Sequence, residues 1–375
     1  MTDWTIFKLA GCLVVLPLAA LAGVNVNVSG SAYVDFMGTD TADARQNSLS
    51  GLTPELALKL DVDATDELAV SVRACLGCHG VTLDRFHVEW TPTPAFNVQV
   101  GRITVPFGDF TQRYDTSAHR AASKPLIYEM GRMVFGRQNQ MNLGVTPTPY
   151  GDTGALVYGQ VWLGKLVQLW YGAYVVGGFK GENDLDWASM YQSYFNDNNR
   201  IPSGGARVVL TYSAEVPGAV LKDVSLGVSG MGGGYDRAHT RNTFAFAADL
   251  SARIGPITAR AEVALRRTDI NPNLPGYRLE VIDPWIEKSG FYVELEHALF
   301  DRVLLGYRFD GLQRAGVPLP GADPRLQPVT LLLRYTQAVQ VNIITGLFAK
   351  GSYEYWLPSP FGSAHVFHLG LGGVF

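Results

Sequence analysis

The sequence predicts an all-β protein, a transmembrane antiparallel β-barrel of about 16 strands with a long loop folded inward. The first observation is the composition, since 41 Gly, 17 Tyr and 18 Phe in 375 residues indicate many turns and many interfacial aromatic side chains. The second is a period-two alternation of apolar and polar residues in segment after segment. The third is the spacing of these segments, because short and long connections alternate along the chain.

The alternation defines two faces of the predicted strands. Phe86, Val88 and Trp90 share one face, and Arg85, His87 and Glu89 occupy the other. A barrel strand needs about 9 to 11 residues that are apolar toward lipid and polar toward the lumen, because hydrocarbon leaves no water for unpaired backbone groups. After the first 22 residues no apolar run approaches the roughly 20 residues that a membrane helix requires.

Sixteen segments fit this strand pattern. They are 24–37, 55–63, 68–74, 81–91, 95–105, 153–163, 166–177, 204–215, 222–231, 242–253, 257–267, 287–298, 302–311, 328–337, 339–350 and 362–375. Short turns are expected at 63–66, 92–94, 164–165, 255–256 and 300–301, with long connections between them. An even strand number with this rhythm is typical of a bacterial barrel whose two ends lie in the periplasm. The glycine-rich stretch 227–234 is expected to be a flexible strand end.

The first residues predict an export signal. Lys8 precedes an apolar run from Leu9 to Leu21, and Ala20-Leu21-Ala22 resembles a cleavage site. We therefore expect residues 1–22 to be a signal peptide and residues 23–375 to form the barrel in the bacterial outer membrane. Removal of the signal takes away Cys12 and leaves two cysteines.

Those two cysteines lie in a C-x-x-C-H motif formed by Cys75, Cys78 and His79. Two thiols at this spacing can bind the vinyl groups of one haem c covalently, and the next histidine can ligate the iron on the proximal side. A disulfide between Cys75 and Cys78 is the second interpretation, because an exported protein enters an oxidising compartment. A zinc site is the third, although no second C-x-x-C or H-x3-H pair supplies the remaining ligands.

A haem iron would also have a distal position. His119 is the candidate ligand, because it lies in the long connection 106–152, which could cover a haem from inside the barrel. His119 as a solvated loop histidine is the alternative. Met130, Met133 and Met141 lie in the same connection, while His87 is about 27 Å of extended strand away from His79.

Residues 101–108, with Gly101-Arg102 followed by Pro106-Phe107-Gly108, resemble a stretch of sixteen-stranded porins of the phosphate-selective type. The resemblance implies that 106–152 is a constriction loop that folds inward and narrows the pore. It also implies a possible homotrimer. Phe375 at the end of the last strand is similar to the signal read by the outer-membrane assembly machinery. One departure is a predicted lumen of mixed charge, which indicates salt bridges in the wall; its members are Arg207, Arg260, Arg308, Arg334, Asp249, Glu262, Glu294, Glu296 and Asp310.

A porin barrel with a C-x-x-C-H motif at 75–79 is also similar in concept to fused outer-membrane cytochrome-porins. That resemblance implies electron transfer across or at the outer membrane, with a periplasmic c-type cytochrome as a possible partner. The alternative is a passive diffusion porin for small anions or other solutes, with Cys75–Cys78 as a structural disulfide. The net charge of -4 excludes a basic nucleic-acid surface, and the absence of G-x-S-x-G and H-E-x-x-H motifs indicates no enzymatic activity.

Overall fold

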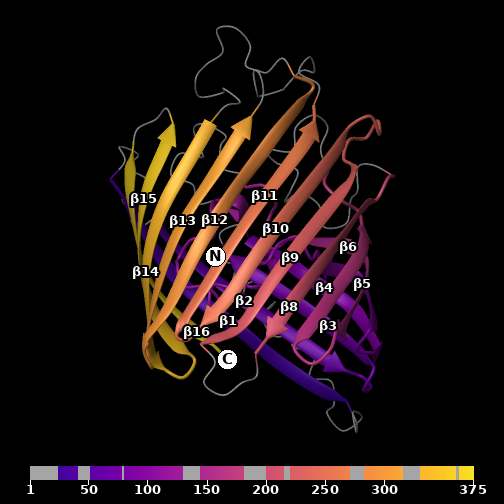
Figure 1. Ribbon diagram of the computed structural model, residues 1–375, viewed down its shortest axis with the longest axis horizontal. Helices are drawn as coiled ribbons and strands as arrows, with labels where there is room; N and C mark the ends of the chain where they lie inside the picture. The colour runs from indigo at the N-terminus through magenta and orange to yellow at the C-terminus, as the bar shows by residue number, and fades with distance from the viewer. Residues whose placement is uncertain are drawn as a thin grey trace, which may run out of the picture.

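The computed structural model describes residues 24–40, 51–77, 80–129, 144–180, 200–214, 220–270, 283–315, 330–359 and 363–375. They form one closed antiparallel barrel (Figure 1). Its strands are β1 (Asn25–Thr39), β2 (Leu52–Asp63), β3 (Leu68–Gly77), β4 (Gly80–Thr93), β5 (Phe96–Thr104), β6 (Gly151–Trp162), β7 (Val167–Val176), β8 (Ser203–Ser213), β9 (Leu221–Gly234), β10 (Asn242–Ile254), β11 (Ile257–Asp269), β12 (Trp285–Phe300), β13 (Val303–Ala315), β14 (Thr330–Ile344), β15 (Leu347–Ser359) and β16 (Ala364–Val374).

Each strand pairs with its neighbours in the chain, and β1 pairs with β16 to close the sheet. The closing register runs from Ser31 opposite Val374 to Thr39 opposite Val366. Beyond it, the Gly30 N–H donates to the Phe375 carbonyl at 3.0 Å, and the Phe375 N–H donates back at 3.1 Å. Closure leaves no sheet edge, so the backbone groups of the wall are paired strand to strand.

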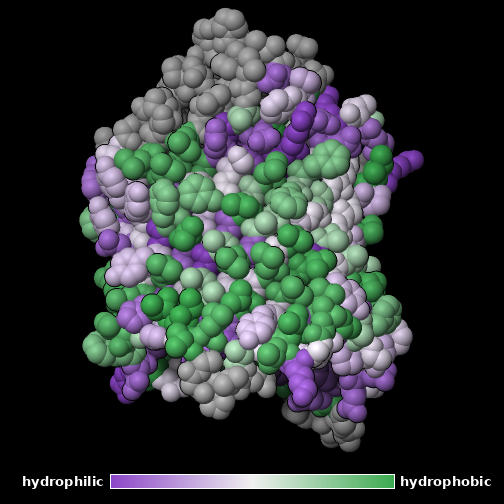
Figure 2. Space-filling model, in the orientation of Figure 1, coloured by the Kyte–Doolittle hydropathy of each residue, from purple (hydrophilic) through white to green (hydrophobic). Residues whose placement is uncertain are grey.

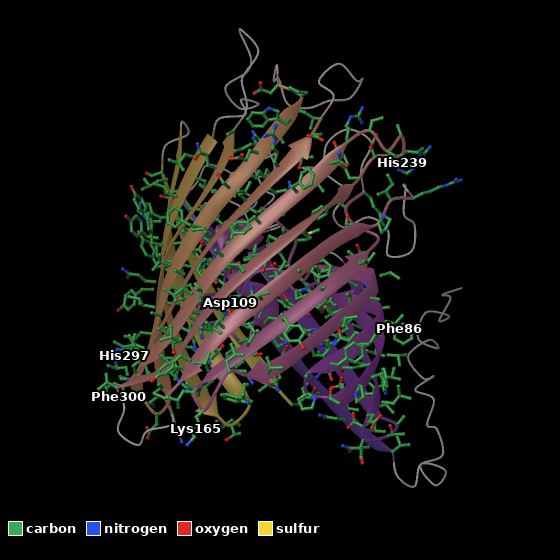
Figure 3. The ribbon with its side chains drawn as sticks, turned by 45° about the vertical axis from the view of Figure 1, so that its right-hand side comes forward. Phe86, Asp109, Lys165, His239, His297 and Phe300 are labelled. Carbon is green, nitrogen blue, oxygen red and sulfur yellow. The ribbon has the colours of Figure 1, made fainter. Side chains whose placement is uncertain are left out.

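The two rims of the barrel differ in the length of their connections. One rim has the turns 64–67, 94–95, 163–166, 255–256, 301–302 and 345–346, and the other carries most of the longer connections between strands. Figure 3 shows Lys165 at the first rim and His239 at the opposite one. By the usual arrangement of such barrels, the rim with the short turns faces the periplasm.

The outer face is apolar and the inner face polar, as the alternation predicts. Phe86, Val88 and Trp90 are exposed on the outside of β4, whereas His87 between them is buried toward the lumen. Figure 2 shows the resulting hydrophobic surface, with hydrophilic residues gathered near the rims. Such a surface suits a hydrocarbon environment. Among the described residues, no helix is long and apolar enough to cross a membrane.

The prediction of a barrel with about 16 strands is confirmed, and two details are wrong. The expected break near residue 338 does not exist, because β14 continues to Ile344 and the turn lies at 345–346, where Gly346 has a φ of 82°. Within β14, Thr336, Ala338 and Gln340 all face inward in one unbroken alternation. The glycine-rich stretch 227–234 is not a loose strand end either, since β9 pairs with both neighbours along it.

The connection between β5 and β6 turns into the barrel, as expected. The loop begins after Thr104, at the end of β5. Within β5, Gly101 has a φ of 129° and contacts that admit no side chain: a Cβ there would lie 2.5 Å from the Phe86 carbonyl oxygen. The loop then forms two short 3-10 helices, η4 (Phe110–Gln112) and η5 (Leu126–Tyr128). Its described parts, 105–129 and 144–150, are largely buried and bond to side chains of the inner wall. We call residues 105–150 the constriction loop.

Candidate functional site: the lumen and its constriction loop

The constriction loop has an apolar core of its own. Phe107, Phe110, Leu126 and Tyr128 are fully buried in one cluster. The rings of Phe110 and Tyr128 stack with centroids 5.5 Å apart, and Tyr292 of β12 meets Phe110 edge-on at 6.5 Å. Burial of these aromatic rings stabilises the loop inside the barrel through the hydrophobic effect and ring contacts.

Side chains of β11 and β12 hold Phe110, Arg113 and Tyr128 of the loop. The Tyr128 hydroxyl donates to Glu262, and the Tyr292 hydroxyl donates to the same carboxylate at 3.0 Å. Arg113 of the loop donates to Glu294 at 2.9 Å. The prediction of wall salt bridges is therefore correct for Glu294, whereas the hydrogen bonds of Glu262 come from two tyrosines and a loop amide.

The loop segment at Lys124 and Leu126 is held by β13 and β14. Asp310 accepts the Leu126 N–H at 2.9 Å and pairs with Arg334 at 2.6 Å. Arg334 also donates to the Lys124 carbonyl at 2.6 Å and lies 3.5 Å from Glu354. These side chains are fully buried, so each depends on its partners for the hydrogen bonds that water would otherwise make.

Strand β15 completes the attachment. Lys350 donates to the carbonyls of Thr116 and His119, and the Ser352 hydroxyl accepts the Ala122 N–H at 2.9 Å. A buried ammonium with two carbonyl acceptors replaces part of its lost hydration. The loop is therefore fixed to the wall from β11 to β15.

The opposite part of the wall remains open to solvent. On β2 the side chains of Lys59 and Asp61 are 38% and 22% exposed, and on the loop those of Asp109 and Asp115 are 28% and 26% exposed. By contrast, Arg334 and Asp310 are completely buried. Water therefore reaches the lumen beside β2 and beside Asp109 and Asp115 of the loop. We call the inward faces of β2 to β4 the open wall.

Three basic residues lie side by side on the open wall. Lys59, Arg73 and Arg85 occupy paired positions on β2, β3 and β4. Lys59 pairs with Asp61 at 2.6 Å, and Arg73 pairs with Asp115 of the loop at 2.9 Å. Among the described residues Arg85 forms no ion pair, and its Nε is buried without a hydrogen-bond partner. Sequence alone did not single out this row, because strand register decides which residues become neighbours.

The structure places one member of the C-x-x-C-H motif. Cys75 lies on β3 opposite Thr82 and shares the inward face with Arg73; its thiol is free and half-buried. Cys78 and His79 lie outside the described residues, in the connection between Gly77 and Gly80. Cys75 lies between Ala57 of β2 and Thr82 of β4, whose hydroxyl donates to the Cys75 carbonyl at 3.3 Å and to Asp84 at 3.1 Å. The haem interpretation of the motif stays a prediction.

His119 lies in the constriction loop and is fully buried. Its Nδ1 bonds the Ala121 carbonyl at 2.8 Å, its ring packs on Phe110 at 5.4 Å, and Nε2 has no described partner. Burial, followed by the nearby charges of Lys350 and Arg308, holds the pKa of His119 well below its usual value. The structure thus places His119 in the packed interior of the loop, and its role as a distal haem ligand stays a prediction.

The described part of the chain contains no cluster of three or more His, Cys, Asp or Glu residues that is arranged to hold a metal ion. The lumen combines the charged open wall with aromatic and amide side chains near the rim with the short turns.

The comparisons with known proteins agree with this architecture. No family model and no curated protein sequence matches the chain. Among solved structures, OmpF of Salmonella typhi in complex with daunomycin has a TM-score of 0.60 at 10% identity, covering 94% of this chain and 98% of its own. An anion-selective porin from Comamonas acidovorans has a TM-score of 0.56 at 11% identity, covering 94% and 100%.

Two further structures show the same likeness. The outer-membrane channel DcaP of Acinetobacter baumannii has a TM-score of 0.54 at 13% identity, covering 94% of this chain and 98% of its own. OmpT of Vibrio cholerae, in a trimer form, has a TM-score of 0.54 at 9% identity, covering 94% and 100%. At these identities the likeness establishes the fold. A closed sixteen-stranded porin-like barrel with an apolar outer surface is a protein of the bacterial outer membrane.

Proposed function

We propose that the chain is a passive diffusion porin for small solutes. The observation that carries this proposal is the unequal lumen: the constriction loop covers the wall from β11 to β15, while Lys59 and Asp61 on the open wall remain accessible to solvent. A fixed loop beside a solvated, charged wall supports a narrow aqueous path.

The charges beside this path give no strong preference for cations or for anions. Lys59 faces Asp61, and Arg73 faces Asp115, so most of the charge is paired. Arg85 forms no ion pair with the described residues, and we propose that it contacts passing anions. Homotrimer formation belongs to the same proposal and is supported by the trimer form of a structural neighbour.

Single-channel recording in planar bilayers tests the proposal. Refolded protein is expected to give stable conductance steps in potassium chloride, and Arg85→Glu is expected to move the reversal potential in a salt gradient toward cation preference. Arg237→Glu, in the exposed connection between β9 and β10, is the matched control. Protein that inserts as a folded barrel and conducts no ions would refute the porin proposal.

We also propose, in second place, a haem-bearing role in electron transfer, on the strength of the C-x-x-C-H motif. Cys75 supports it by presenting a free thiol to the lumen beside the connection that carries Cys78 and His79. The porin stands first because the solvent-accessible charges of Lys59 and Asp61 lie in the described part of the chain, whereas Cys78 and His79 lie outside it.

Expression together with the haem-attachment machinery separates the two proposals. A haem-bearing protein is expected to stain for peroxidase after denaturation and to lose the stain in Cys75→Ala and Cys78→Ala variants. Wild-type protein that is colourless, with no added tetrapyrrole mass in the mass spectrum, would end the electron-transfer proposal and leave the porin intact.

A further inference from the structure

A half-open pocket of about 390 Å³ lies inside the barrel near the rim with the short turns. Its wall comes from β4 to β7 and includes Tyr158, Trp170, Asn97, Gln160, Thr91 and Thr93. This is the rim at which Figure 3 shows Lys165. The volume falls in the range of small-molecule binding sites, which is roughly 300 to 1,000 Å³.

The chemistry of the pocket is aromatic and polar without formal charge. The rings of Tyr158 and Trp170 lie with centroids 6.3 Å apart and an interplanar angle of 32°. Two amides and two hydroxyls surround them, and no charged residue is among the residues that line the pocket. Aromatic faces carry partial negative charge and accommodate C–H groups, while amides and hydroxyls pair with solute hydroxyl groups.

The polar groups are already oriented by neighbours. The Tyr158 hydroxyl donates to Glu89, which also accepts a hydrogen bond from Gln99 at 2.8 Å. The Tyr158 oxygen can therefore accept a hydrogen bond from a solute. The Gln168 amide donates to the Gln160 carbonyl oxygen at 3.2 Å, and this leaves the Gln160 N–H groups for a solute.

Glu89 also argues against an anionic occupant. Its carboxylate lies directly behind Tyr158, and the side chains that donate to it, Gln99 and Tyr158, are neutral. An anion in the pocket would meet this negative charge at close range and be repelled. A neutral solute would not.

We propose that this pocket is a binding subsite for small, neutral, polyhydroxylated solutes of the saccharide class. This assignment of a saccharide subsite rests on the proposed porin function, because a solute reaches the pocket through the lumen. The Trp170 ring provides the stacking face, and the amide of Gln160 and the phenol of Tyr158 provide hydrogen bonds.

The test uses trehalose, a neutral disaccharide, as the probe. Trehalose added on the side of the short-turn rim is expected to interrupt the potassium chloride current of single wild-type channels, with slower binding from the opposite side. In Trp170→Ala the affinity is expected to fall roughly tenfold, the loss expected for one aromatic stacking surface. Trp170→Phe is expected to restore much of it.

Trp90→Ala is the matched control, because Trp90 lies on β4 near the same rim and is exposed on the outer face. It is expected to bind trehalose like the wild type. Trehalose interruptions that persist unchanged in Trp170→Ala, or channels that conduct ions and never respond to trehalose, would overturn the subsite. A barrel that conducts no ions at all would instead refute the porin proposal.

Discussion

At the scale of single residues, Gly227 allows an ion pair to cross a strand. Arg207 of β8 and Asp249 of β10 meet through two hydrogen bonds of 2.6 and 3.0 Å across β9. A Cβ at Gly227 would lie 2.6 Å from the Asp249 Oδ2 atom and 2.7 Å from the Arg207 Nη2 atom. The glycine that looked like a loose strand end is therefore needed for a buried charge pair.

Gly227→Ala is expected to displace this pair and lower the free energy of unfolding by about 2 kcal/mol, since a disturbed buried ion pair leaves poorly compensated charge. The midpoint of heat-induced unfolding, followed by the mobility shift of the folded barrel on gels, measures the change. Gly230→Ala on the same strand is the control, because a Cβ there meets nothing within 4 Å. Equal midpoints for the two variants would show that Gly227 has no such role.

Arg334 links the constriction loop to two buried carboxylates of the wall. Arg334→Met keeps similar volume but leaves Asp310 and Glu354 buried without this partner, so we expect a loss of about 3 to 5 kcal/mol. Arg253→Met is the comparison, because Arg253 pairs with Asp223 at 2.5 Å but is 55% exposed, where such pairs contribute about 0 to 1 kcal/mol. Denaturant unfolding in detergent gives both values, and a small loss for Arg334→Met would contradict the assignment.

At the scale of elements, alternation predicted the strands well because each wall residue faces either lipid or lumen. In β16, within the predicted segment 362–375, Phe367, Leu369 and Leu371 alternate and are all exposed on the outer face. The predicted boundary between two strands at residue 338 was wrong. Ala338 faces the lumen between the polar residues Thr336 and Gln340, and its apolar side chain interrupts the alternation of apolar and polar residues there.

The candidate site was less predictable from the sequence. The inward position of Arg85 follows from alternation, but its place beside Arg73 depends on strand register and on the bulge between Arg73 and Ala74. Likewise, Tyr158 and Trp170 form one pocket with Thr91 only because the sheet curves, which no local pattern encodes.

The constriction loop gives a prediction about pH. Burial holds the pKa of His119 well below 6.5, so this ring is neutral while the constriction loop is packed against the inner wall. We call this packed state the seated loop and a state detached from the wall the released loop. Above about pH 6.5 neither the seated nor the released loop binds the proton, and His119 has no effect. As pH falls below that value, only the released loop is protonated, so seating weakens progressively until the pH reaches the lowered pKa.

Current fluctuations of single channels are therefore expected to increase on acidification from pH 7 to pH 5 in the wild type. His119→Gln keeps a hydrogen-bonding side chain and cannot titrate in this range, so its currents are expected to change less. Carboxylates elsewhere in the lumen titrate in both proteins, and the difference between the two isolates His119. Identical pH responses would contradict this account.

At the scale of the whole molecule, the pairing of β1 with β16, which we call the seam, closes the barrel. β1 and β16 lie at opposite ends of the described chain, and their pairing brings Gly30 against Phe375 (Figure 1). This contact has the largest sequence separation in the sheet, so the chain must lose more loop-closure entropy there than at any hairpin. Seam formation is thus a demanding step of assembly.

Gly30→Val is expected to impair that step. A Cβ at Gly30 would lie 2.5 Å from the Ala57 carbonyl oxygen and 2.7 Å from the Phe375 ring, so β2 and the last residue would both have to move. The folded fraction after refolding into detergent should fall severalfold, measured by gel mobility shift. Gly38→Ala on the same strand should refold normally, because its Cβ would meet only Phe36 at 3.6 Å. Phe375→Ala in the Gly30→Val background should recover part of the yield, since it removes one of the two clashes, whereas no recovery would place the defect at Ala57.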